Sequence, residues 1–69
     1  SNMASISNDG NLVLYFAKGE RAIINGMDVV VTVVECGLGG CKLAFEADRQ
    51  KFKIDREKVY KQKIASGSY

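Results

Sequence analysis

The charged side chains that could bind a partner are concentrated near the C-terminus, in the stretch KFKIDREKVYKQKI at 51–64. That stretch carries six basic and two acidic residues, whereas residues 1–50 carry four basic and six acidic ones. The local balance of +4 against −2 predicts an anionic partner for this end of the chain. A solvated face explains the basic helical residues Lys58, Lys61 and Lys63 equally well, with long-range attraction as their alternative role.

Catalytic and metal chemistry find little support in the residue types. The chain has no His and two Cys, and a structural zinc site needs about four such ligands. Its carboxylates show no paired arrangement suited to acid–base catalysis. The GLGG stretch at 37–40 lacks the Lys-Ser/Thr that follows a phosphate loop. We therefore expect a protein that is not an enzyme and takes no cofactor, metal ion or small-molecule substrate.

The two cysteines, Cys36 and Cys41, flank GLGG and leave two possibilities open. They can be cross-strand neighbours joined by a disulfide, or two small apolar side chains. Their C-x4-C spacing is not the C-x2-C of a metal knuckle. A reducing cytoplasm, the expected compartment, favours the apolar interpretation.

The pattern along the chain predicts short strands followed by one helix. Residues 1–11 are polar and turn-rich, and Ser1-Asn2 resembles a remnant of recombinant expression; we expect a flexible start, a domain over 12–65 and a tail over 66–69. Asn-Gly is the strongest turn signal, and GLGG predicts a four-residue hairpin loop. Asp55 is expected to cap the helix, with Glu57 in its first turn and SGS at its end. The expected strands are 12–17, 21–24, 28–36, 41–47 and 51–54.

A chain of this size is expected to be only marginally stable as a monomer. A domain of 69 residues buries only about 60% of its unfolded surface. Its edge strands would also expose unpaired backbone groups. Strand exchange between two copies resolves both difficulties. We therefore expect a mainly β fold of five short strands and a C-terminal helix, intertwined as a homodimer that forms a small β-barrel or sandwich.

Three motifs resemble the carbon storage regulator (CsrA/RsmA) family. They are LxLxxxxGE at Leu12–Glu20, VxVTV followed by LA at Val29–Ala44, and IDREKVY at Ile54–Tyr60. The resemblance covers roughly residues 12–64. It implies an intertwined homodimer in which the first strand of one subunit lies beside the fifth strand of the other. Each composite edge binds RNA, preferring a GGA triplet in a hairpin loop.

The resemblance also implies which residues bind RNA. Leu14 matches a first-strand leucine that touches RNA, and Ile54 and Arg56 match a fifth-strand valine and the key arginine. Residues 46–50, with Asp48, Arg49 and Gln50, fall on the loop that reads guanine edges. Arg56 offers a fork of donors suited to phosphate or guanine.

Several positions depart from the family pattern. Its two arginines before Gly-Glu fall at Phe16 and Ala17, so Lys18 alone keeps a positive charge there. Each lost phosphate contact lowers the salt slope of binding by about 0.7. The family's Ala-Pro loop reads Ala47-Asp48-Arg49, and its histidine before the key arginine is Asp55. Phe16 either stacks on a base, sharing a face with Leu14, or packs against the dimer partner.

These observations predict an RNA-binding post-transcriptional regulator in the cytoplasm. Its partners would be mRNA leaders, small regulatory RNAs and a second copy of itself. No apolar run approaches the roughly 18 residues of a membrane span, so no membrane is expected. The alternative is a divergent paralogue with weak or no RNA binding that acts through a mixed dimer or a protein antagonist.

Overall fold

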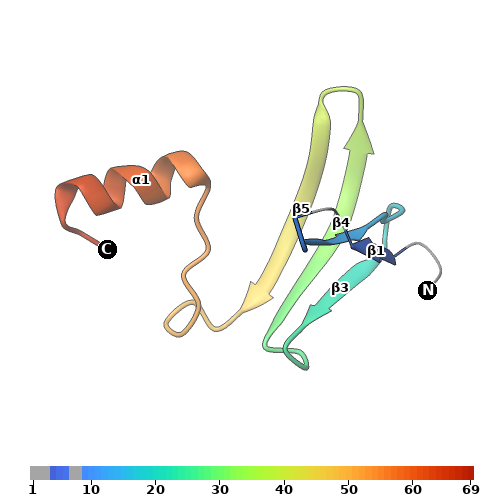
Figure 1. Cartoon of the computed structure of the whole chain (residues 1–69), viewed down its shortest axis with the longest axis horizontal. Coiled ribbons are helices and arrows are strands. Elements are labelled where there is room, and N and C mark those ends of the chain that lie inside the picture. Colours follow the sequence, from blue (N-terminus) through green and yellow to red (C-terminus); the bar gives the residue numbers. More distant parts are fainter. Residues whose placement is uncertain (1–3, 7–8) are drawn as a thin grey trace.

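Antiparallel strands and one C-terminal helix make up the computed structural model, which describes residues 4–6 and 9–69 (Figure 1). Two strands form a separate ribbon, β1-β2, and three form the sheet β3-β4-β5. The expectation of a mainly β chain with a C-terminal helix is confirmed, but within one chain the sheets do not close into a barrel. The elements are β1 (Ala4–Ile6), β2 (Leu12–Leu14), β3 (Arg21–Ile24), β4 (Val29–Gly37), β5 (Gly40–Ala47) and α1 (Glu57–Ser66).

Strand β4 is the centre of the three-stranded sheet. Its valines and threonine are stiff, β-branched residues that suit a pleated surface. It pairs with β3 from Arg21↔Thr32 to Ile24↔Val29, and with β5 from Val29↔Ala47 onwards. The register with β5 shifts between Val33 and Glu35, where a bulge interrupts the ladder. The distal part of the β4–β5 hairpin therefore extends beyond β3 (Figure 1).

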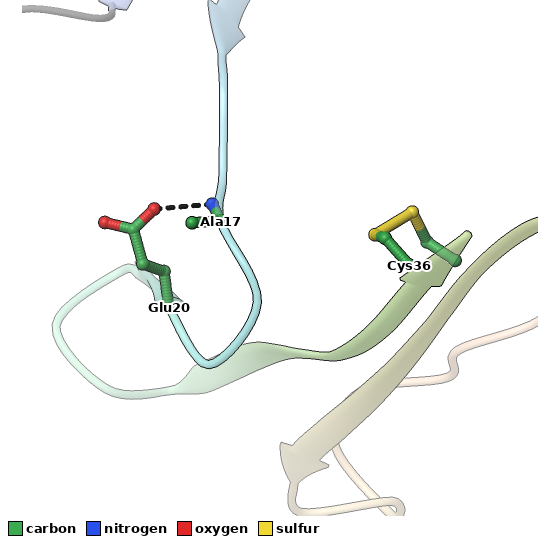
Figure 2. Close-up of a disulfide and its surroundings, with 4 residues drawn as sticks. Ala17, Glu20 and Cys36 are labelled. Atoms are coloured by element: carbon green, nitrogen blue, oxygen red, sulfur yellow. Dashed lines mark hydrogen bonds between the residues drawn. A yellow bond between two sulfur atoms is a disulfide. The ribbon is translucent and has the colours of Figure 1, made fainter. Parts of the chain in front are cut away.

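The loop Gly19-Glu20, one of the resemblance motifs, fastens the chain to β4. Gly19 has a φ of +89°, which favours glycine. Its amide donates to Val33 O at 2.7 Å, and the Val33 amide donates to Glu20 O at 3.0 Å. The Glu20 carboxylate accepts from the Ala17 amide at 2.7 Å (Figure 2). The motif thus has a structural role that does not depend on any ligand.

The core within one chain is very small. Among the described side chains only Val30 and Val33 are buried, and Val30 is 2% exposed. Helix α1 buries none of its residues, and its apolar stripe of Val59, Tyr60 and Ile64 lies open to solvent. No helix in the described ranges combines the length and apolarity needed to cross a membrane.

The expected fifth strand, 51–54, is not a strand in this structure. The segment from Phe52 to Arg56 has no regular structure, although Phe52 and Ile54 are half-buried between exposed lysines, as the alternation predicts. Two causes combine. The amides of Lys51 and Phe52 donate to Asp48 O, which draws the start of the segment into a turn. No sheet edge of the described chain pairs with the remainder.

The N-terminal segment also differs from the expectation. Ala4–Ile6 forms β1, paired antiparallel with β2 from Ala4↔Leu14 to Ile6↔Leu12. Nothing in that polar stretch signals a strand. The expected expression remnant, Ser1-Asn2, lies outside the described residues. Strand β2 stops at Leu14, so it is shorter than the expected 12–17.

Helix α1 starts without the expected cap. Its N-cap is Arg56, in an extended conformation, and no side chain caps it. The prediction of Asp55 as the cap is wrong, because its carboxylate reaches Lys63 instead. Glu57 does lie in the first turn, and the SGS stop is confirmed: Gly67 is left-handed, and the amides of Gly67 and Ser68 donate to Ile64 O and Lys63 O.

Candidate nucleic-acid interface

Three of the residues expected to bind RNA line one cavity. The chain leaves β5, turns at 48–51 and runs back beside that strand to α1 (Figure 1). This return path brings Arg49, Ile54 and Arg56 to a cavity of about 510 Å³, a size typical of ligand pockets. Its full lining is Cys41, Leu43, Phe45, Arg49, Ile54, Asp55 and Arg56.

One wall of the cavity is a face of β5. Cys41, Leu43 and Phe45 are two residues apart, so their side chains point to the same side of the sheet. Leu43 is 45% exposed and Phe45 is 39% exposed, so this wall is an open apolar patch on the edge strand of the sheet. This wall was not predicted from the sequence, although the alternation of apolar residues in CKLAFEA indicates it.

The charge of the cavity is positive because its one carboxylate is neutralised. Asp55 Oδ1 accepts from Lys63 Nζ at 3.0 Å, and the Asp55 side chain is only 13% exposed. Its Oδ2 atom is buried without a hydrogen-bond partner among the described residues. Within residues 4–6 and 9–69, neither Arg49 nor Arg56 forms an ion pair. Both guanidinium groups are therefore available to bind a ligand, because the Asp55 carboxylate is paired with Lys63.

The loop after β5 is held by Asp48. Its side chain accepts from the Gln50 amide at 2.9 Å, and its carbonyl accepts from the amides of Lys51 and Phe52 at 3.0 and 2.8 Å. These three amides are engaged, so they could read a guanine edge only if the turn opened. Asp48 and Gln50, both expected at the site, are absent from the cavity lining, whereas Arg49 between them contributes to it.

The expected first-strand residues lie elsewhere in the same chain. Leu14 ends β2 and is exposed, Phe16 is half-buried beyond the end of that strand, and Lys18 is exposed in the turn before Gly19. None of the three lines the cavity. Because β2 stops at Leu14, the strand alternation that would place Phe16 on the same face as Leu14 does not extend to it.

The two cysteines form a disulfide at the tip of the β4–β5 hairpin (Figure 2). They face each other in the register, and their Cα atoms are 4.1 Å apart. Both are exposed and bridged, so the favoured interpretation as two unbridged, small apolar side chains is wrong. The strands also continue to Gly37 and Gly40, leaving a two-residue turn, Leu38-Gly39, in place of the expected four-residue loop.

A second cavity, of about 690 Å³, adjoins this tip. Cys41 and Arg56 line both cavities, so the two are neighbouring parts of one groove. We call it the β5 groove. The residues that line only its second part are Glu35, Cys36, Gly37, Gly39, Gly40 and Lys42.

The tail also contacts the segment that leads to the helix. Lys53 Nζ donates to Tyr69 O at 2.8 Å and lies 4.5 Å from the centre of the Tyr69 ring. That ring meets Tyr60 edge to face, with centroids 5.0 Å apart. Lys53 is thus engaged by the tail, which leaves the arginines as the main cationic groups of the groove.

The lining determines what the groove can bind. Guanidinium groups bind anions through paired donors, and an open aliphatic and aromatic wall accepts a planar apolar surface. A nucleotide combines both features. Comparison with models of known protein families, with curated proteins and with solved structures finds no match for this chain.

Proposed function

We propose that this chain is an RNA-binding post-transcriptional regulator that recognises GGA-type hairpin loops in mRNA leaders and controls translation or mRNA stability. One observation carries the proposal: Arg49, Ile54 and Arg56, matched to RNA-contacting positions by the sequence resemblance, converge on one cavity. Unpaired loop bases are splayed out and recognised by stacking and by hydrogen bonds to their edges. An arginine fork beside Phe45 supplies both kinds of contact.

The working form in this proposal is a cytoplasmic homodimer. The two side chains that are buried among residues 9–69 cannot offset the conformational entropy that folding removes from a chain of this length. The helical stripe of Val59, Tyr60 and Ile64 leaves apolar area that a second copy would cover. Within the described residues the segment 51–54 pairs with no strand, and strand exchange would give it a partner. The same exchange would bring Leu14, Phe16 and Lys18 of one copy towards Arg56 of the other.

A second function remains in competition with RNA binding. The exposed apolar face of β5 also suits a protein partner, and Phe16-Ala17 replace the expected arginine pair. A divergent paralogue of this kind would bind RNA weakly and act through a mixed dimer or a protein antagonist. Under this alternative, Leu43 and Phe45 determine the affinity for the protein partner, and Arg56 does not.

The test is a titration against a GGA-loop RNA hairpin and a scrambled hairpin at two salt concentrations. The proposal expects tighter binding to the GGA loop at both. Arg56→Ala should cost about 1–3 kcal/mol of binding to that loop, and Arg56→Lys should restore charge without restoring selectivity. Lys58→Ala is the matched control, because Lys58 is an exposed helical lysine outside the groove lining.

The outcomes separate the candidates. Equal, weak binding to both hairpins that disappears at the higher salt concentration would exclude a specific RNA reader. Sedimentation analysis of the same protein tests the homodimer: a folded monomer at micromolar concentration would contradict the proposed assembly. A Phe45→Ala variant that loses a protein partner but keeps its RNA affinity would favour the second function.

A further inference from the structure

The hairpin tip lies directly beside Arg56 and forms the outer part of the β5 groove. Lys42 and Arg56 supply two cations there, and Glu35 supplies one carboxylate. Lys42 stands opposite Glu35 in the β4–β5 register. Within the described residues, neither Glu35 nor Lys42 forms an ion pair. Arg56 also lines the inner cavity, so the two parts of the groove share this cation.

Three glycines, Gly37, Gly39 and Gly40, leave the floor of this outer part without side chains. No heavy atom outside their chain neighbours lies within 4 Å of where a Cβ would stand on any of them. Backbone without side chains permits close approach of a ligand and leaves its polar groups accessible. A phosphate between Lys42 and Arg56 would meet this backbone directly.

The disulfide lies at the base of that floor. The glycines on either side of Leu38 give the tip wide conformational freedom, and the bridge between Cys36 and Cys41 closes the tip at its base. Both half-cystines line the outer cavity, so the bridge is itself part of the surface. The paired strands below the tip continue to Val29↔Ala47, and they hold the hairpin together independently of the bridge.

We propose that the tip of the β4–β5 hairpin is an additional nucleotide-phosphate subsite of the β5 groove, and that the Cys36–Cys41 bridge keeps this subsite in its binding shape. The inference rests on the proposed function, because its ligand is the RNA that occupies the groove. Reduction by a dithiol breaks the S–S bond and leaves two thiols. The bridge takes up two electrons and two protons, and the dithiol becomes a cyclic disulfide.

Redox sensitivity follows from the position of the bridge. Both cysteines are exposed, so a reductant can reach the sulfur atoms. In a reducing compartment, bridges of this kind are usually transient and redox-responsive. RNA affinity would then be higher in the oxidised protein and lower in the reduced protein.

The experiment measures Kd for a GGA-loop RNA hairpin with oxidised protein and with protein held in excess dithiol. We expect reduction to weaken binding about ten-fold, because the freed tip must be ordered again on binding. The double variant Cys36→Ser/Cys41→Ser should bind like reduced protein, and dithiol should not change its Kd. Circular dichroism in both states shows whether the sheet persists.

A second variant tests the subsite without touching the bridge. Lys42→Gln in the oxidised protein should weaken binding and lower the salt slope by about 0.7. Lys58→Gln, the control, should leave both unchanged. An unchanged salt slope for Lys42→Gln would overturn the subsite even if reduction unfolded the chain.

The remaining outcomes distinguish this inference from the proposed function. RNA binding with the same Kd in oxidised and reduced protein would overturn the role of the bridge and leave the proposed function standing. No selective RNA binding in either state would overturn the proposed function, and the subsite with it.

Discussion

The two ends of strand β4 turn the chain by different means. At its start, Asn25, Gly26 and Met27 all have positive φ values of 50°, 62° and 78°, and the Asn25 side-chain amide donates to the Asp28 carboxylate. At its end, the two-residue turn Leu38-Gly39 is closed by the Cys36–Cys41 bridge. One turn is held by local backbone and side-chain preferences, and the other by a covalent bond.

The difference shows where the molecule can respond to its surroundings. The turn at 25–28 contributes no residue to the β5 groove lining, and no thiol chemistry affects it. The turn at 38–39 adjoins that groove, and its conformation depends on a bond that a reductant can break. The end of the sheet that is least fixed by its own sequence is therefore the end that carries the proposed phosphate subsite.

The largest expected effect comes from reducing the bridge and comparing hydrogen exchange at the two turns. By the chain-entropy relation, a closed loop as short as this one contributes roughly 2 kcal/mol. Amides of β4 and β5 next to the tip should then exchange about thirty-fold faster after reduction, whereas those beside Asn25–Asp28 should change little. Equal acceleration at both turns would mean that the bridge stabilises the whole sheet, and the contrast between the ends would be lost.

A smaller effect is expected from adding a methyl group at the tip. Gly40 has a φ of +135°, so Gly40→Ala should destabilise the chain by about 1–2 kcal/mol. Gly39 has no positive φ and has open space at its Cβ position. Gly39→Ala is thus the matched control and should be neutral or slightly stabilising. Chemical denaturation of both variants gives the comparison, and equal loss in both would contradict the turn geometry.

Much of the fold was predictable because its signals are local. The β-branched run of β4, the Asn-Gly turn and the glycine at the end of the helix each depend on residues within a few positions, and the structure agrees with all three. The segment 51–54 could not be assigned in this way. Alternation places Phe52 and Ile54 correctly on one side, but a strand also needs a neighbouring edge, and an edge is a property of the assembly.

The site was predictable only in part, for a related reason. Arg49, Ile54 and Arg56 were identified by position in a motif, and they meet in the groove. The wall of Leu43 and Phe45 was missed because an alternating strand face is normally assigned to the core. The prediction that Asp55 caps the helix was wrong because a cap is inferred from adjacent residues. The Asp55 carboxylate instead accepts from Lys63, which lies eight positions away.

The smallest expected effect tests whether the turn at 25–28 contains backbone strain at Met27. Met27 is a bulky residue at a φ of +78°, a conformation that costs L residues about 1–2 kcal/mol. Met27→Gly removes that cost but gives the unfolded chain more freedom, so we expect a net gain of about 0.5 kcal/mol in the free energy of unfolding. Met27→Ala keeps the backbone cost and should give no gain. Because the Met27 side chain is exposed, its loss should contribute little to either result. If Met27→Gly proved less stable than Met27→Ala in guanidinium unfolding, Met27 would not hold this left-handed conformation in solution. The turn at 25–28 would then not be fixed by local sequence preferences, and its contrast with the bridged tip would fail.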